Sequence, residues 1–160
     1  MKKLLLVRHA KAVHDADYSD FERPLKHSGT RDAITMTDRL SRQSVVPQLL
    51  VTSPSLRTLA TADIFAEHLG LRKPTENEGI YDASRQTLLD IVSQFPDEQS
   101  FIGLVGHNPG ISQLLDYYTG ESRDVSPGAV ALITFEVDQW KLLSRDTGKL
   151  TWFSSPKDGH

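Results

Sequence analysis

The sequence predicts an α/β protein, built as a three-layer α/β/α sandwich around a mainly parallel sheet. Short, continuously apolar segments alternate with amphipathic helical segments through most of the chain, which is the pattern of strand–helix–strand units. The apolar segments, such as LLLV and LLV, lack the polar alternation of a half-exposed strand, so helices should cover both faces of the sheet. The last part of the chain carries two strand-like segments without a helix between them. These segments predict antiparallel edge strands near the C terminus.

Length and composition indicate one soluble globular domain over residues 1–160, because 38% of the residues are hydrophobic and 24% are charged. No run of about eighteen apolar residues is present, and the N-terminal apolar run is too short for a signal peptide, so we expect no membrane association. The absence of cysteine excludes disulfides, thiol chemistry and cysteine-ligated zinc, and a cytoplasmic location is the simplest expectation. The net charge of −3 argues against nucleic-acid binding, although residues 1–31 hold seven Lys and Arg against four Asp and Glu.

The first half of the chain contains two expected strands and two expected helices. Residues 3–9 form the first strand, and a loop rich in Asp, Tyr and Ser leads to a helix over residues 29–42. Residues 49–53 form a second buried strand. The next helix, over residues 54–69, is preceded by a serine that suits the N-cap and begins with a proline that suits the first helical position. Gly70 is a natural stop for this helix.

The second half changes from helix and strand alternation to strands alone. Ser84 can cap a helix whose apolar residues recur at spacings of three, four and seven. Residues 101–107 form a third buried strand, which the turn sequence NPG ends. The C-terminal strands are expected over residues 128–137 and 149–155, where they form a hairpin. Between the third strand and this hairpin lies a helix with apolar side chains at Ile111, Leu114 and Leu115.

Arginine and histidine side chains follow each of the three parallel strands. Arg8 and His9 come at the end of the first strand, Arg57 lies one helical turn beyond the second, and His107 ends the third. In open α/β sheets ligands bind outside the carboxyl ends of the strands, so these four side chains should converge on one edge. No carboxylate stands among them at these positions, so the expected cluster is cationic.

A phosphoryl group is the ligand that this cluster fits best. Guanidinium groups bind phosphoryl oxygens bidentately, and the start of the helix over residues 54–69 would add backbone N–H groups. A histidine beside two arginines should have a lowered pKa, because the neighbouring positive charge disfavours its protonated form. Neutral imidazole is a competent nucleophile. The missing carboxylate and thiolate ligands argue against a divalent metal, so neither a metal nor another cofactor is expected.

Three segments of the sequence, VRHAKA, SPSLRTLATA and VGHNPG, resemble the signatures of the histidine phosphatase superfamily, also called the phosphoglycerate mutase-like superfamily. Ala10 stands where the family usually has glycine, as is common in the branch of SixA-type phosphohistidine phosphatases. The segment DFERPLKHSG, from Asp20 to Gly29, is similar to a further stretch of that branch. The resemblance implies a phosphoglycerate mutase-like sandwich and a metal-independent phosphatase.

The resemblance also implies a role for each member of the cluster. His9 corresponds to the nucleophile that becomes phosphorylated, and Arg8 and Arg57 correspond to the arginines that clamp the phosphate. His107 corresponds to the second histidine, which binds the phosphoryl oxygens and stabilises the transition state.

The general acid is less clearly marked. The segment NEGIYDAS offers Glu78 and Asp82, and we prefer Asp82 because it follows an apolar pair similar to the start of the family's acid segment. Alternatively, Asp82 caps the following helix or is solvated, and a phosphohistidine substrate would need little help from an acid. Arg23 is a further candidate for phosphate binding unless it pairs with Asp20, and Lys11 is one unless it is merely solvated.

The expected activity is therefore the removal of phosphate from phosphohistidine through a phosphohistidine intermediate. The implied partner is a phosphorylated protein, such as a histidine-containing phosphotransfer domain or a phosphocarrier protein. A small-molecule phosphomonoesterase acting on a phosphorylated metabolite is the first alternative. A non-catalytic phosphate- or phosphoprotein-binding module is the second.

Overall fold

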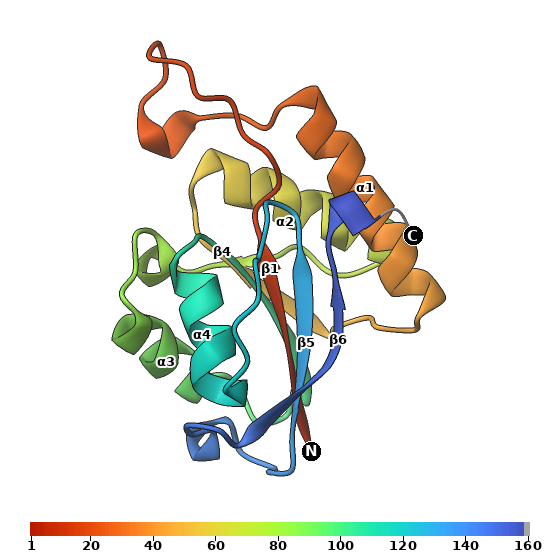
Figure 1. Cartoon of the computed structure of the whole chain (residues 1–160), viewed down its shortest axis with the longest axis vertical. Helices are drawn as coiled ribbons and strands as arrows, with labels where there is room; N and C mark the ends of the chain where they lie inside the picture. The colour runs from red at the N-terminus through yellow and green to blue at the C-terminus, as the bar shows by residue number, and fades with distance from the viewer. Residues whose placement is uncertain (159–160) are drawn as a thin grey trace.

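A computed structural model describes residues 1–158 and shows the expected α/β sandwich, a six-stranded sheet with helices on both faces (Figure 1). The helices are α1 (His27–Arg42), α2 (Leu56–Leu69), α3 (Arg85–Ser93) and α4 (Gly110–Thr119). The strands are β1 (Lys2–Arg8), β2 (Leu49–Thr52), β3 (Thr75–Glu76), β4 (Phe101–Gly106), β5 (Val130–Phe135) and β6 (Gly148–Ser154). Short 3₁₀ turns are η1 (Asp20–Glu22), η2 (Glu78–Ile80), η3 (Trp140–Leu142) and η4 (Pro156–Asp158).

The sheet has the strand order β3-β2-β4-β1-β5-β6 and is parallel except for its C-terminal pair. β1 lies between β4, which runs parallel to it, and β5, which runs antiparallel. The C-terminal strands pair as a hairpin, as expected, but only β6 is an edge strand because β5 pairs with β1 on its other side. The opposite edge is β3, a strand of two exposed polar residues that no apolar pattern could indicate.

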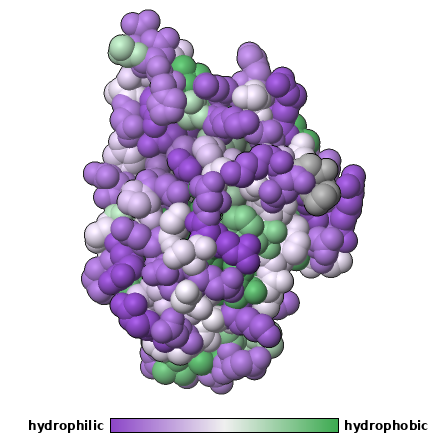
Figure 2. All heavy atoms as spheres, viewed as in Figure 1, coloured by the Kyte–Doolittle hydropathy of each residue, from purple (hydrophilic) through white to green (hydrophobic). Residues whose placement is uncertain are grey.

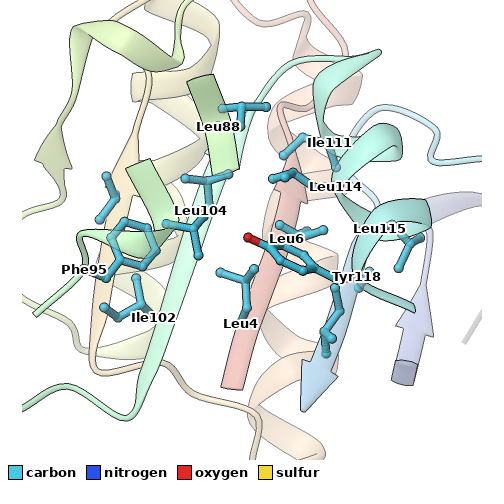
Figure 3. Close-up of a cluster of buried hydrophobic side chains, with 14 of the residues drawn as sticks. Leu4, Leu6, Leu88, Phe95, Ile102, Leu104, Ile111, Leu114, Leu115 and Tyr118 are labelled. Atoms are coloured by element: carbon cyan, nitrogen blue, oxygen red, sulfur yellow. The ribbon is translucent and has the colours of Figure 1, made fainter. Parts of the chain in front are cut away.

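The apolar run of β1 stabilises both layers of the sandwich. Leu4 and Leu6 join the core beneath α3 and α4, whereas Leu5 and Val7 join the core beneath α1 and α2. All four side chains are fully buried, and each stabilises the fold by roughly 2 kcal/mol relative to exposure. Figure 3 shows the first of these cores, in which Leu4 and Leu6 meet side chains of α4 such as Tyr118. β1 is therefore fixed from both faces.

The helix boundaries follow the expected signals with one correction. Ser84 caps α3, since its hydroxyl accepts a hydrogen bond from the Thr87 N–H, and Gly70 ends α2 in the left-handed conformation at φ 69°. However, α2 begins at Leu56, so Pro54 is not its first residue and Ser53 is not its N-cap. The Ser53 hydroxyl instead accepts a hydrogen bond from the N–H of Ser55, in the turn before the helix.

The surface is consistent with apolar residues that are mostly packed in the interior. The face shown in Figure 2 is largely hydrophilic, with smaller hydrophobic areas. None of the helices within residues 1–158 combines the length and apolarity that a membrane span requires.

Candidate active site

The carboxyl ends of β1, β2 and β4 meet at one edge of the sheet, which lies at its upper end in Figure 1. Arg8 of β1 pairs with Gly106 of β4, so the residues that follow these two strands are neighbours in space. A cavity of about 410 Å³ opens here and is lined in part by residues of the loop that connects β1 to α1. The structure brings all four residues of the expected cationic cluster into its lining: Arg8, His9, Arg57 and His107.

Hydrogen bonds hold both the backbone and the ring of His9. Its N–H donates to the Gly106 carbonyl at 3.0 Å, and its carbonyl accepts from the Gly128 N–H at 3.0 Å. Its ring Nδ1 lies 2.8 Å from the carbonyl oxygen of Ala10. Because a carbonyl can only accept, Nδ1 carries the proton, and Nε2 therefore keeps its lone pair.

Each of the two arginines has a buried Nε–H group that has no hydrogen-bond partner among the described residues. Arg8 donates from Nη1 to the Val125 carbonyl at 2.9 Å. Arg57 donates from Nη1 to the Asp20 carbonyl at 2.6 Å and from Nη2 to the Asp20 carboxylate at 3.2 Å. In both residues Nε is buried without a partner among the described residues. Because buried donors in proteins are nearly always hydrogen-bonded, these two N–H groups indicate a site for an acceptor such as a phosphoryl oxygen.

His107 connects the second arginine to the end of β2. Its Nδ1 accepts a hydrogen bond from Arg57 Nη2 at 3.2 Å, and its Nε2 lies 2.9 Å from the buried hydroxyl of Ser53. Its ring centroid lies 5.4 Å from that of His9, in an edge-on arrangement. The two imidazoles therefore stand side by side at the base of the cavity.

Both histidines are neutral near pH 7. Burial, followed by the charges of His107, Arg57 and Arg8, lowers the pKa of His9 to about 3. Burial, followed by the charge of Arg57, lowers the pKa of His107 to about 4. The expected lowering of the His9 pKa is confirmed, but desolvation rather than neighbouring positive charge is its largest cause.

The family described as the histidine phosphatase superfamily (branch 1) matches residues 4–84, just over half of the chain. This segment includes Arg8, His9 and Arg57, three of the four clustered residues. The chain belongs to the histidine phosphatase superfamily.

One further protein and several solved structures are similar to this chain. An uncharacterized chloroplastic protein of Arabidopsis thaliana is 26% identical over 152 residues, which cover 88% of this chain and 69% of that protein. The protein histidine phosphatase SixA complexed with tungstate has a TM-score of 0.84 at 22% identity over 98% of each chain. A protein of Agrobacterium tumefaciens assigned as the phosphohistidine phosphatase SixA has a TM-score of 0.84 at 22% identity, over 97% of this chain and 98% of its own.

The fold also resembles that of a phosphatase with a different named substrate. A mycobacterial glucosyl-3-phosphoglycerate phosphatase complexed with VO₃ has a TM-score of 0.71 at 15% identity, over 97% of this chain and all of its own. The likeness to the SixA structures therefore confirms the fold of that branch and leaves the substrate to the chemistry of the site.

The two acid candidates of this histidine phosphatase lie in different places. Both are exposed, but Asp82 lines the cavity and Glu78 is not part of the lining. Asp82 does not cap α3, because Ser84 does. Its backbone has φ 52°, a left-handed conformation that aspartate tolerates better than most residues.

Arg23 and Lys11 both line the cavity, and each is engaged by a carboxylate. Arg23 forms an ion pair with Asp20 at 3.2 Å, and Lys11 forms one with Asp32 at 3.0 Å. The Lys11 side chain is half exposed. The alternative that Arg23 pairs with Asp20 is therefore confirmed, although both cations remain near enough to meet a ligand at the mouth of the cavity.

Sequence reasoning missed three residues that hold this site together, Asp20, Ser53 and Tyr81. Tyr81 donates a hydrogen bond from its hydroxyl to Asp20, and its ring packs edge-on against His107 with centroids 5.6 Å apart. The Tyr81 hydroxyl, followed by the charge of Arg57, holds the pKa of Asp20 at about 2. Asp20 stood in a recognised segment, but only the fold shows that it reaches Arg57.

The helix that begins at the cavity is α4 rather than α2. Residues 107–111, which lead into α4, all line the cavity, whereas Arg57 is the only lining residue from the start of α2. The first N–H groups of α4 are engaged within the protein, however, since those of Ile111 and Ser112 donate to His107 and Asn108. The expected contribution of N–H groups from a helix start therefore stays a prediction. Within residues 1–158 no group of three or more His, Cys, Asp or Glu side chains is placed to hold a metal ion.

Proposed function

We propose that this chain is a metal-independent phosphatase in which His9 is the nucleophile. Membership of the histidine phosphatase superfamily supports phosphatase activity. The observation that carries the assignment of His9 is its hydrogen bond from Nδ1 to the Ala10 carbonyl, which leaves Nε2 as the basic nitrogen. The unsatisfied Nε donors of Arg8 and Arg57 support a phosphoryl group bound beside it.

The first step transfers the phosphoryl group to the enzyme. The lone pair of His9 Nε2 attacks phosphorus, a P–N bond forms, and the bond to the leaving group breaks with its electron pair. Arg8 and Arg57 neutralise charge on the equatorial oxygens, where such a clamp is most effective. The Ala10 carbonyl keeps the Nδ1 proton and so stabilises the positive charge that develops on the ring.

The second step returns the enzyme to its starting state. Water attacks the phosphorus of phosphohistidine, the P–N bond breaks, and its electron pair returns to His9 Nε2. The products are inorganic phosphate and the neutral imidazole that the buried site favours. Asp82 is the one acid candidate in the lining that could protonate a leaving group or accept the proton of this water.

The proposed substrate is a phosphohistidine side chain on a partner protein, such as a histidine-containing phosphotransfer domain or a phosphocarrier. An imidazole leaves more readily than an alkoxide, which suits a site where Asp20 is held ionised and only Asp82 remains as an acid. The SixA fold supports the same substrate class. The shared fold with a glucosyl-3-phosphoglycerate phosphatase favours a small phosphorylated metabolite as the second candidate.

The nucleophile is tested by His9→Ala, with His27→Ala as the matched control. His27 is an exposed histidine that does not line the cavity. Steady-state assays of phosphohistidine peptide should show a loss of at least about 1000-fold in kcat for His9→Ala. His27→Ala should keep the wild-type rate. Turnover by His9→Ala at the wild-type rate would falsify the mechanism.

A substrate panel and a labelling experiment separate the alternatives. Phosphohistidine peptide, sugar phosphates and nucleotides are compared by kcat/KM, and the proposal requires phosphohistidine to be the best substrate. Radiolabelled substrate should leave an acid-labile, base-stable phosphoenzyme on wild type and none on His9→Ala. A non-catalytic binding module would bind the substrate without ever becoming labelled.

A further inference from the structure

Asp20, in the DFERPL segment, is the residue through which the loop after β1 reaches the site. Its carboxylate accepts hydrogen bonds from Tyr81 and Arg57 and forms an ion pair with Arg23. Its carbonyl accepts a further bond from Arg57. It thus joins three separate parts of the chain: its own loop, the start of α2 and the turn after η2.

Asp20 contacts the terminal edge of the Arg57 guanidinium and does not contact its Nε–H. The two terminal nitrogens, Nη1 and Nη2, both donate to Asp20, at 2.6 Å and 3.2 Å. Nη2 also donates to His107 at 3.2 Å, and Nε is buried without a partner among the described residues. Since a guanidinium is rigid and planar, fixing its terminal edge also fixes the direction of the Nε–H bond.

The geometry points to a positioning role for Asp20 rather than to competition with the phosphoryl group. A carboxylate that merely occupied the anion site would leave when the ligand arrived, but one of the two acceptors that Asp20 offers to Arg57 is its main-chain carbonyl. The Tyr81 hydroxyl also restrains the carboxylate, because it donates to Oδ2, the same oxygen that accepts from Arg57. We propose that Asp20 orients Arg57 so that two groups meet the phosphoryl oxygens in the transition state. These groups are the Nε–H of Arg57 and the ring of His107, which Arg57 contacts. This inference rests on the proposed phosphatase function.

Loss of this orientation should affect catalysis more than binding. The Asp20 side chain is more than half exposed, so removing its charge changes the attraction for an anion only weakly. Misplacement of a clamping group by about 1 Å, in contrast, costs up to about 100-fold in rate. Asp20→Asn should therefore lower kcat while leaving the affinity for inorganic phosphate nearly unchanged.

The test compares Asp20→Asn with Asp17→Asn, which makes the same change of charge at an exposed position of the same loop outside the cavity lining. Assays with phosphohistidine peptide should show kcat lowered about 10- to 100-fold for Asp20→Asn and unchanged for Asp17→Asn. Calorimetry should give a Kd for inorganic phosphate within about threefold of wild type for both. All assays are run at a temperature where circular dichroism shows both variants folded.

A double-variant cycle asks whether Asp20 acts through its contacts. Tyr81→Phe removes the hydroxyl that restrains the carboxylate, so it should lower kcat by a smaller factor. The pair Asp20→Asn with Tyr81→Phe should be no slower than Asp20→Asn alone, because the first change already removes the carboxylate that the Tyr81 hydroxyl restrains. Additive losses would overturn this shared role.

The outcomes separate this inference from the function on which it rests. If wild type turns over substrate and Asp20→Asn is as active as Asp17→Asn, the positioning role is wrong and the phosphatase stands. If Asp20→Asn binds phosphate more than about tenfold tighter with unchanged kcat, Asp20 is a competitor for the anion site and the positioning role is again wrong. If wild type turns over nothing in the panel, the proposed function fails and this role fails with it.

Discussion

Among single residues, Asp82 is the proposed acid, and this role would decide which leaving groups the site could expel. It lines the cavity, whereas Glu78 lies outside, and Asp20 is held ionised by Tyr81 and Arg57. A general acid typically contributes about 100-fold or more when the leaving group is poor, and much less when the leaving group departs readily. The effect of removing Asp82 should therefore depend on the substrate.

We expect Asp82→Asn to lower kcat for an alkyl phosphate ester by about 100-fold and kcat for phosphohistidine peptide by less than about threefold. The measurement is steady-state turnover of both substrates by the same preparation. Glu78→Gln is the matched control, an exposed carboxylate four residues earlier that should leave both rates unchanged. Equal losses on the two substrates would show that Asp82 does not act as an acid.

The four residues of the expected cluster share one property, which is that each lies at the end of a buried strand or shortly after it. Arg8, His9 and His107 could be assigned because β1 and β4 are recognisable as apolar runs. Asp20 could not be assigned in this way, because its partners Arg57 and Tyr81 lie 37 and 61 residues away and its own loop is polar. Contacts between distant exposed loops leave no local periodicity in a sequence.

At the level of elements, the start of α1 packs unusually closely against the segment that follows the nucleophile. A Cβ atom on Gly29 would lie 2.2 Å from the Lys11 carbonyl oxygen and 3.0 Å from its nitrogen. The same carbonyl accepts a hydrogen bond from the Lys26 N–H at 2.9 Å, and Ala12 pairs with Leu25 beside it. Only glycine permits this approach, so α1 supports the backbone two residues beyond His9.

Gly29→Ala should therefore separate α1 from this segment and destabilise the protein by about 1–3 kcal/mol, the usual cost of overpacking. It should also lower kcat, because the backbone after His9 moves with the segment. Urea unfolding and steady-state kinetics measure the two effects. Thr35→Ala, an exposed position in the same helix, should change neither. A Gly29→Ala variant with wild-type stability would contradict the close packing.

Elements buried on both faces could be predicted, and elements held by main-chain pairing alone could not. β1, β2 and β4 are apolar in sequence because both layers of helices cover them. β3 consists of two exposed residues joined to β2 by backbone hydrogen bonds, and η1 is a polar turn. Nothing in the composition of β3 or η1 distinguishes them from a loop.

For the molecule as a whole, the active site carries a cost in stability that depends on pH. The folded protein keeps His9 neutral in a buried position, with a pKa of about 3 against an ordinary 6.5. The unfolded chain binds a proton at His9 below about pH 6.5, whereas the folded protein binds it only near pH 3. Between these limits the unfolded state holds more protons, so the free energy of unfolding falls as the pH falls.

The contribution of His9 to this pH dependence should be measurable by substitution. From about pH 6.5 to pH 5, wild type should lose at most about 2 kcal/mol of stability through this residue, and almost nothing through it above about pH 7.5. His9→Gln cannot take up the proton, so its unfolding free energy should fall less steeply over the same range, as urea titrations in phosphate-free buffer can show. His27→Gln, an exposed control, should keep the wild-type slope. A His9→Gln slope equal to that of wild type would mean that the imidazole is solvated and protonates freely in the folded protein, contrary to the buried, neutral nucleophile.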